Sequence, residues 1–334
     1  MQDEATIASE AELIGLLAPL AAGAAGALGL IDDCALLDPP EGCELVLKTD
    51  PVAEGVHFLA DDAPEDVAWK ALAVNVSDLV AKGARPLGYL MALAFPQAPR
   101  RAWVVRFAAG LMAAQQRFGC ALLGGDTDRR PGALTIAITA IGVVARGRMV
   151  RRATARAGDL MFASGTLGDA ALGLALRRNP QQAARWGLAP PEADHLRARF
   201  VRPQPRLALA SALREHARAA MDVSDGLAKD AARMCAASAV AGRIALARLP
   251  LSAACAKALA AEPTLIARIV SGGDDYEVLA AVPPDAASAF RAAAGAAGVA
   301  VTEIGSFGEG QGLLLAGADG RPLALARTGW DHLA

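Results

Sequence analysis

The segment ELVLKTD (44–50) is typical of a buried strand, and two segments of contrasting pattern follow it along the chain. Residues 64–82, PEDVAWKALAVNVSDLVAK, begin with a proline and two acidic residues, as the first turn of a helix often does. The next segment, LGYLMALAF (87–95), is again an apolar run of strand length, and Pro96 blocks its continuation. This strand–helix–strand order predicts an α/β fold in which helices pack on a sheet.

The same alternation continues through the rest of the chain. Further strands are predicted at 55–59, 120–125, 133–144, 159–164, in the first part of 217–226 and near 276–282. Further helices are predicted at 99–118, 168–178 and 204–219, and GSFGEGQG (305–312) is interpreted as a hairpin turn. At about 100–200 residues per domain, 334 residues suffice for two domains. The basic turn near 145–155 places them at 1–148 and 149–334.

Composition excludes several classes of protein. With 54% apolar and 20% charged residues, the chain is not of the disordered class, and its net charge of −2 gives no general reason to bind nucleic acid or anionic lipid. Five scattered cysteines without a C-x-x-C pair predict a reducing, cytoplasmic environment. Residues 13–31 carry no charge, so a membrane anchor is an alternative, but this stretch is mostly Ala and Gly and includes Pro19. We expect a short helix there, followed by a flexible glycine-rich segment that leads to Asp32, and no membrane span.

Aspartates follow apolar runs at six places. These are LIDD (30–33), LKTD (47–50), VNVSD (74–78), LLGGD (122–126), MDVSD (221–225) and VSGGDD (270–275). Acids at strand ends lie where open α/β sheets usually build ligand crevices. With only five lysines in the chain, so many carboxylates would repel one another unless cations neutralised them, and oxygen ligands suit Mg²⁺. The pattern indicates a polyphosphate held through several Mg²⁺ ions, although a single aspartate such as Asp225 could instead cap a helix.

Together these phrases resemble the thiamine-monophosphate kinase family. The motifs that carry the resemblance are DDCALL (32–37), TD followed by EGVHF (49–58), WKALAVNVSDLVAKGARP (69–86), GGDT (124–127), DVSDGL (222–227), SGGDDYE (271–277) and GWDHL (329–333). The resemblance implies ATP-dependent transfer of the γ-phosphoryl group onto thiamine monophosphate, directly and in line, assisted by several Mg²⁺ ions. It also implies the two-domain fold of aminoimidazole ribonucleotide synthetase, a homodimer built around a β-barrel of N-terminal sheets, and an active site in the cleft between domains.

The resemblance assigns roles residue by residue. The family's magnesium-binding positions are matched by Asp33, Thr49, Asp50, Asp78, Asp126, Asp222 and Asp225. Its ATP-contacting positions are matched by Gly125, Asp126, Arg152 and Ser224, and its thiamine-monophosphate positions by His57, Asp274 and Trp330. Asp126 and Arg152 are the expected catalytic residues, because the repulsion between two polyanions is the main obstacle to the transfer.

Three residues depart from the family pattern. Ile31 stands where the family usually has glycine, Lys48 where a small hydroxyl residue is common, and Pro51 where threonine is frequent. A cation at Lys48 could replace one metal contact, so the number of Mg²⁺ ions stays open. Asp274 also has a shorter side chain than the glutamate of some relatives.

Other functions remain as alternatives. Selenophosphate synthetases share the expected fold but would carry a reactive cysteine or selenocysteine in a glycine-rich N-terminal segment, and hydrogenase-maturation relatives would end in a cysteine-bearing tail. Aminoimidazole ribonucleotide synthetase gives no reason for the late Trp330. A non-catalytic nucleotide-binding scaffold is a further alternative, which binding of ATP without turnover would favour.

Overall fold

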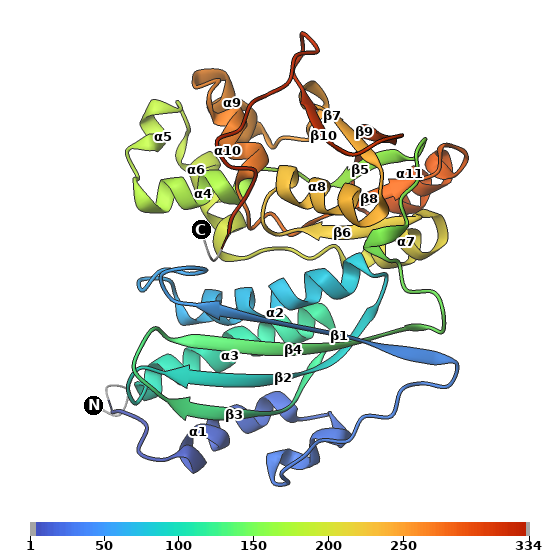
Figure 1. The fold of residues 1–334 in the computed structure, drawn as a ribbon. Coiled ribbons are helices and arrows are strands. Elements are labelled where there is room, and N and C mark those ends of the chain that lie inside the picture. The colour runs from blue at the N-terminus through green and yellow to red at the C-terminus, as the bar shows by residue number, and fades with distance from the viewer. Residues whose placement is uncertain (1–4, 332–334) are drawn as a thin grey trace. The chain divides into compact units, whose positions relative to one another are not determined.

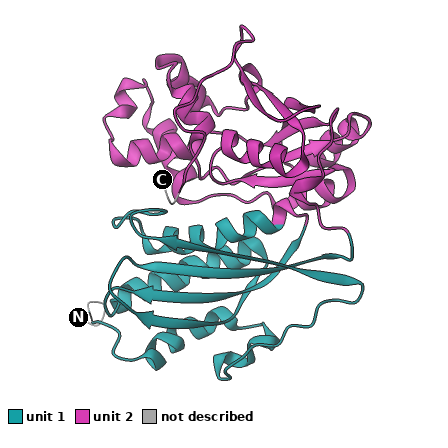
Figure 2. Cartoon of the chain, viewed as in Figure 1, with its two compact units in different colours: residues 1–79, 84–147 teal, residues 80–83, 148–334 magenta. Residues whose placement is uncertain are grey.

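The computed structural model describes residues 5–331, which form two compact units (Figure 2). Unit 1 comprises residues 1–79 and 84–147, and unit 2 comprises residues 80–83 and 148–334. Each unit combines one β-sheet with helices, which confirms the mixed α/β class.

Unit 1 contains a four-stranded sheet of order β1-β4-β2-β3 (Figure 1). Its strands are β1 (Cys43–Ala53), β2 (Arg85–Phe95), β3 (Ala121–Arg129) and β4 (Thr135–Ala145). Its helices are α1 (Glu10–Leu17), α2 (Pro64–Ala81) and α3 (Arg101–Phe118), with the 3-10 helices η1 (Ala18–Ala21) and η2 (Ala25–Leu30). Only β2 and β3 pair in parallel, and β1 is an edge strand.

The two faces of this sheet differ in what covers them. Helices α2 and α3 lie against one face, and the alternation of side chains buries Val46 and Val52 of β1 toward the interior. The opposite face, called the open face below, carries Leu47 with 65% of its surface exposed and Leu90 with 40% exposed. The open face is therefore apolar where β1 and β2 present it.

Unit 2 contains a six-stranded sheet of order β10-β7-β9-β5-β8-β6. Its strands are β5 (Leu160–Ser164), β6 (Ala219–Val223), β7 (Ala241–Ala245), β8 (Glu277–Val282), β9 (Val301–Gly308) and β10 (Gly312–Ala316). Its helices are α4 (Asp169–Arg178), α5 (Gln182–Arg185), α6 (Pro190–Val201), α7 (Ala210–His216), α8 (Leu227–Ser238), α9 (Ala253–Ala261), α10 (Leu265–Ser271) and α11 (Ala287–Ala296). Successive residues of β8 enter different cores: Leu279 packs with α4, α8 and α10, and Ala280 with α7 and α11. Helices on both faces explain why EVLAAV is an unbroken buried run.

Three sequence predictions of local structure are wrong. Residues 55–57 form a turn rather than a strand, because Gly55 adopts φ +80° and only an isolated bridge joins Glu54 to Phe58. The helix predicted at 204–219 begins only at Ala210, after Pro203 and Pro205 have excluded the regular helix. The segment 305–312 is no hairpin, since β7 lies between β9 and β10 and pairs in parallel with β10.

The uncharged stretch 13–31 folds as short helices. It contains most of α1, then η1 and η2. The glycine-rich part therefore forms short helices, and the expectation of a flexible segment is wrong there. Leu28 and Gly29 interrupt η2 with positive φ angles. Within residues 5–331, no helix combines the length and the apolarity that crossing a membrane requires.

Candidate functional site

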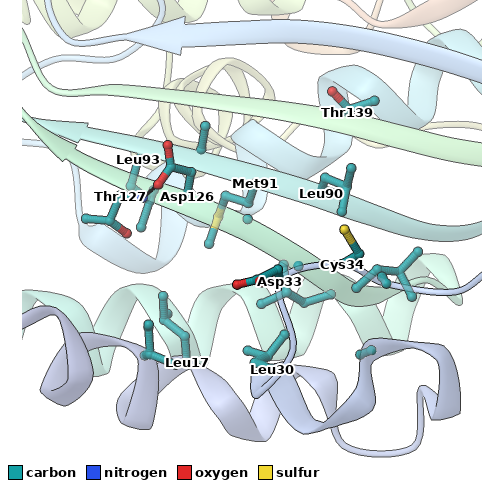
Figure 3. A pocket seen from close by; sticks show the side chains of 18 of the residues that line it. Leu17, Leu30, Asp33, Cys34, Leu90, Met91, Leu93, Asp126, Thr127 and Thr139 are labelled. Carbon is teal, nitrogen blue, oxygen red and sulfur yellow. Dashed lines mark hydrogen bonds between the residues drawn. The ribbon is translucent and has the colours of Figure 1, made fainter.

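A pocket of about 750 Å³ lies between the open face of unit 1 and the N-terminal segment (Figure 3). Asp126 borders it from β3, and Asp33 borders it from the loop that follows η2. Both carboxylates are exposed, and the rest of the lining includes the apolar Leu90, Met91 and Leu93. The structure thus brings two of the predicted metal ligands to one concave site.

Gly125 and Asp126 lie inside β3 rather than beyond its end. A Cβ atom at Gly125 would lie 2.0 Å from the carbonyl oxygen of Met91 on the neighbouring strand, so only glycine fits there. The Oδ1 atom of Asp126 accepts the N–H of Thr127 at 2.8 Å, which fixes one oxygen of the carboxylate. The expectation that the aspartates follow strand ends is wrong here and for Asp50 in β1, whereas Asp225 does follow the end of β6.

Thr49 shares the open face with the pocket. It stands opposite Thr139 in the β1–β4 register, and the Thr139 hydroxyl donates to the Thr49 hydroxyl at 3.1 Å. Because Thr139 itself lines the pocket, Thr49 lies one strand beyond its wall.

Lys48 connects two of the predicted metal ligands on the other side of β1. Its Nζ atom lies 3.0 Å from Asp50 Oδ2 and 2.9 Å from Asp78 Oδ2, which comes from α2. Burial disfavours the charged ammonium, but attraction to Asp78 and Asp50 outweighs this effect and raises the pKa of Lys48 above its usual range. The ammonium is therefore charged throughout the physiological range of pH.

Asn75 was not singled out from the sequence, yet it positions Asp50. Its buried side chain accepts the N–H of Asp50 through Oδ1 at 2.8 Å and donates through Nδ2 to the Asp50 carbonyl at 3.2 Å. The amide of Asn75 thus takes the place of a neighbouring strand at the edge of the sheet. Its position in the VNVSD motif, three residues before Asp78, was the available signal.

His57 lies in the turn after β1. Its Nδ1 atom accepts the N–H of Ala53 at 3.1 Å, so the neutral ring carries its proton on Nε2. In that tautomer Nε2 is the donor nitrogen of the ring, the kind of group that can bind an anion.

In unit 2, three distant segments meet around one loop. The N–H of Asp274 donates to the carbonyl of Ser224 at 2.9 Å, and the N–H of Trp330 donates to the carbonyl of Asp225 at 2.9 Å. Lys229 of α8 donates to the Trp330 carbonyl. Four of the predicted site residues of unit 2, Ser224, Asp225, Asp274 and Trp330, thereby converge, although 332–333 of the GWDHL motif lie outside the described residues.

Basic side chains already hold the Asp225 carboxylate. Arg233 Nη1 lies 2.5 Å from its Oδ2 atom, and Lys229 Nζ lies 3.6 Å away. Asp225 does not cap α8, whose N-cap is Gly226. Instead the buried carboxylate of Asp230 accepts the N–H groups of Ser224 and Asp225, at 3.0 and 2.9 Å. Burial, and then repulsion from Asp225, raise the pKa of Asp230 to about 6.

Asp222 and Arg152 differ in exposure. Asp222 is buried in β6 opposite Val278, whereas Arg152 is exposed in a 3-10 turn (Arg152–Thr154). Among residues 5–331, no hydrogen bond or ion pair engages the Arg152 guanidinium, so it is available for an anionic ligand.

A buried charge cluster supports the loop that carries Asp274. Asp275 accepts the N–H of Gly168 at 2.8 Å, and burial raises its pKa well above the usual range. Glu277 is fully buried between Arg199 Nη2 at 2.9 Å and Arg206 Nε at 2.7 Å. Asp274 itself adopts φ +73°, a left-handed conformation that is unfavourable for residues other than glycine and is often found at functional sites.

The fit to Mg²⁺ differs between the carboxylates. Asp33 and Asp126 offer exposed oxygen donors, which suit a hard cation. Asp50 and Asp78 do not fit one as they stand, because the Lys48 ammonium lies between them. Nowhere in the part of the chain that the structure describes do three or more His, Cys, Asp or Glu side chains form a group that could hold a metal ion.

Comparisons with known proteins show which family the chain belongs to. Residues 31–144 match the family "AIR synthase related protein, N-terminal domain", and residues 156–316 match its C-terminal domain. A thiamine-monophosphate kinase of Caulobacter vibrioides is 42% identical over 95% of this chain and 88% of its own length.

Two solved structures are also similar over most of their length. One is thiamine-monophosphate kinase from Stenotrophomonas maltophilia K279a, with 39% identity, 88% and 90% of the two chains covered and a TM-score of 0.79. The other is AaThiL complexed with AMPPCP and TMP, with 32% identity, coverage of 97% and 96% and a TM-score of 0.77. This chain therefore belongs to the thiamine-monophosphate kinase family of enzymes, and its two units have the fold of the AIR synthase related proteins.

Proposed function

We propose that this chain transfers the γ-phosphoryl group of ATP to the phosphate of thiamine monophosphate and releases thiamine diphosphate and ADP. The observation that carries the proposal is the convergence of Ser224, Asp225, Asp274 and Trp330 around one loop of unit 2. The similar structure of AaThiL holds an ATP analogue and TMP, which supports the same two substrates here.

The acceptor is bound by three chemically suited side chains. The half-exposed indole of Trp330 offers a face on which the thiazolium cation can lie. Asp274 accepts a hydrogen bond from the aminopyrimidine, and His57 donates Nε2–H to the acceptor phosphate. Each residue meets a different part of thiamine monophosphate.

ATP is bound through Gly125, Asp126, Ser224 and Arg152. The missing side chain of Gly125 lets a phosphate approach the β3 backbone closely. Asp33, Thr49, Asp126 and Asp222 would hold Mg²⁺, with Asp225 as a further ligand where its basic partners give way, while Asp50 and Asp78 are bound by Lys48. Bound Mg²⁺ would neutralise part of the negative charge of the phosphates. Residues 1–148 then serve as the Mg²⁺- and ATP-binding domain, and residues 149–334 complete the site.

The transfer proceeds in line and without a phosphoenzyme. A phosphate oxygen of the acceptor is already anionic near neutral pH, so no strong base is needed. Arg152, which has no partner among the described residues, stabilises negative charge on the transferring group.

The open face of unit 1 pairs with a second copy of this chain. Its exposed Leu45, Leu47 and Leu90 form an apolar surface of the kind that homodimer interfaces bury. Closing two four-stranded sheets on each other would give the β-barrel. The five cysteines are all free thiols, which accords with a cytoplasmic protein.

The test is a product assay. Purified protein is incubated with ATP, Mg²⁺ and thiamine monophosphate, and thiamine diphosphate and ADP are separated by chromatography. Equal amounts of both products, abolished by EDTA, are expected. ADP without thiamine diphosphate would indicate another acceptor, and bound ATP without either product would indicate a non-catalytic nucleotide-binding protein.

A further inference from the structure

Lys48 has the geometry of a bridging cation rather than of a surface ion pair. Lys48 and Asp50 stand two residues apart on the same side of β1, and Asp78 reaches them from α2. One ammonium thus contacts a carboxylate from a strand and a carboxylate from a helix, at 3.0 and 2.9 Å. All three side chains are partly buried, so their attraction is screened less than at the surface.

The surroundings hold the backbone of Asp50 in place and bring Asp78 beside it. Asn75 holds the backbone of Asp50 through two hydrogen bonds, at 2.8 and 3.2 Å. Asn75 and Asp78 lie one helical turn apart on α2, so the same helix positions the anchor and the second carboxylate. Since one Nζ atom contacts both carboxylates, the two carboxylates lie close together. Two ionised carboxylates so close repel each other unless a cation lies between them.

We propose that the Lys48 ammonium is a resident cation of this chain, which takes the place of one divalent ion between Asp50 and Asp78. This inference deepens the proposed function, because it assumes that the two carboxylates would otherwise bind a metal ion of the same site. Lys48 is in this view a positioning residue: it offsets one of the two negative charges, holds the two carboxylates in place and touches neither substrate.

The ammonium compensates only one of the two negative charges. Two carboxylates with one ammonium leave a net charge of −1, whereas the same carboxylates with Mg²⁺ would be neutral. The Lys48 ammonium lies within hydrogen-bond distance of Oδ2 of both carboxylates, so a metal ion cannot occupy the same point between these two atoms. The chain consequently forms this part of the site without metal, and it binds fewer divalent ions than a chain with a small hydroxyl residue at position 48.

The first test counts bound Mn²⁺ by electron paramagnetic resonance in the absence of nucleotide. Lys48→Ser is expected to bind one more Mn²⁺ per chain than the wild type, and the double variant Lys48→Ser with Asp78→Asn is expected to lose that ion. Lys48→Arg keeps the charge and should match the wild type. The matched control is Lys257→Met, which removes a lysine from an exposed pair with Glu192 and should not change the count. An equal count in Lys48→Ser and wild type overturns the inference.

The second test uses thermal unfolding of the same variants. In EDTA, Lys48→Ser should melt below the wild type because Asp50 and Asp78 then repel each other, and added Mn²⁺ should raise its Tm more than that of the wild type. A loss that Mn²⁺ does not restore would make Lys48 an ordinary ion-pair partner and overturn the inference.

The third test needs no variant, so it remains decisive if Lys48→Ser does not fold. Crystals of the wild type grown with Mn²⁺ should show no anomalous peak between the Asp50 and Asp78 carboxylates. A peak bridging them refutes the inference. None of these readouts depends on turnover, so a failed kinase assay would remove the proposed function and leave these results to be judged separately.

Discussion

Thr49 and Asp50 are adjacent in β1, yet their side chains lie on opposite faces of the sheet. Thr49 meets the Thr139 hydroxyl on the open face, while Asp50 meets Lys48 beside α2. Strand geometry forces this separation, because successive side chains alternate between faces. A metal ion on one face of the sheet therefore cannot bind both the Thr49 hydroxyl and the Asp50 carboxylate. The two residues of the TD motif lie in different surroundings.

Asp126→Asn should lower kcat on the order of 100-fold or more while leaving the fold intact, since it removes a charge from the proposed phosphate and metal site. Steady-state kinetics and circular dichroism would measure the two effects. Asp128→Asn is the matched control, because Asp128 is an exposed carboxylate two residues further along the same strand. Near wild-type turnover of Asp126→Asn would remove Asp126 from the site.

Trp330→Ala should raise KM for thiamine monophosphate about 10-fold, the equivalent of 1.4 kcal/mol of cation–π attraction, and change KM for ATP little. The main chain should stay in place, because its contacts to Asp225 and Lys229 are made by backbone atoms of Trp330. Trp330→Phe keeps an aromatic face and should lie between the two. Unchanged KM values in Trp330→Ala would assign the thiazolium to another residue.

Gly125→Ala should destabilise unit 1 by about 2 kcal/mol, because its Cβ atom would overlap the Met91 carbonyl at 2.0 Å. Gly124→Ala is the neighbouring control: its Cβ atom meets only Leu90 Cδ2, at an ordinary 3.5 Å. Urea unfolding would compare the free energies of unfolding. Equal values for the two variants would contradict the close approach of β2 to β3 at Gly125.

Asp230 should make the stability of unit 2 depend on pH. Its pKa is raised to about 6 in the folded chain from about 3.9 when unfolded, so the folded state binds the proton more tightly between these values. Stability from this group is therefore greatest below pH 4, falls as the pH rises toward 6 and stays constant above it, by about 3 kcal/mol in all.

Asp230→Asn tests that dependence, because its Oδ1 atom can still accept the N–H groups of Ser224 and Asp225. Unfolding free energies measured in EDTA between pH 4 and 7 should decline less for the variant than for the wild type. Parallel profiles would show that Asp230 ionises alike in both states.

Long periodic segments were predictable from sequence. Helix α2 was expected at 64–82 and spans Pro64–Ala81, and the helix predicted to end at Gly119 does so through the left-handed conformation of that residue. Turns and sheet topology were harder to predict from the sequence. A turn depends on single backbone angles, and the topology depends on the order of strands that are distant in the sequence. The segment 305–312 has hairpin composition, but β7, which is distant in sequence, lies between the strands it connects.

The candidate site was predictable as a set of motifs but not as a set of contacts. The resemblance named Asp225 and Trp330, and their backbone contact is found. Asn75 and Arg199 support residues that are distant in the sequence, so their contacts could not be assigned, although Asn75 lies in the VNVSD motif. Asp230 bonds residues only five and six positions before it, yet its motif did not single it out. Sequence spacing contains no information about which basic side chain will meet a given aspartate.

The buried trio of Arg199, Arg206 and Glu277 limits how this sequence can change over evolution. Replacing Glu277 alone leaves Arg199 and Arg206 without the carboxylate between them, which typically costs about 3–5 kcal/mol, a large part of a domain's total stability. Replacing all three with apolar residues of similar volume costs far less. Since a change at Glu277 alone passes through an unstable chain, a substitution of Glu277 should be found only together with substitutions of both arginines.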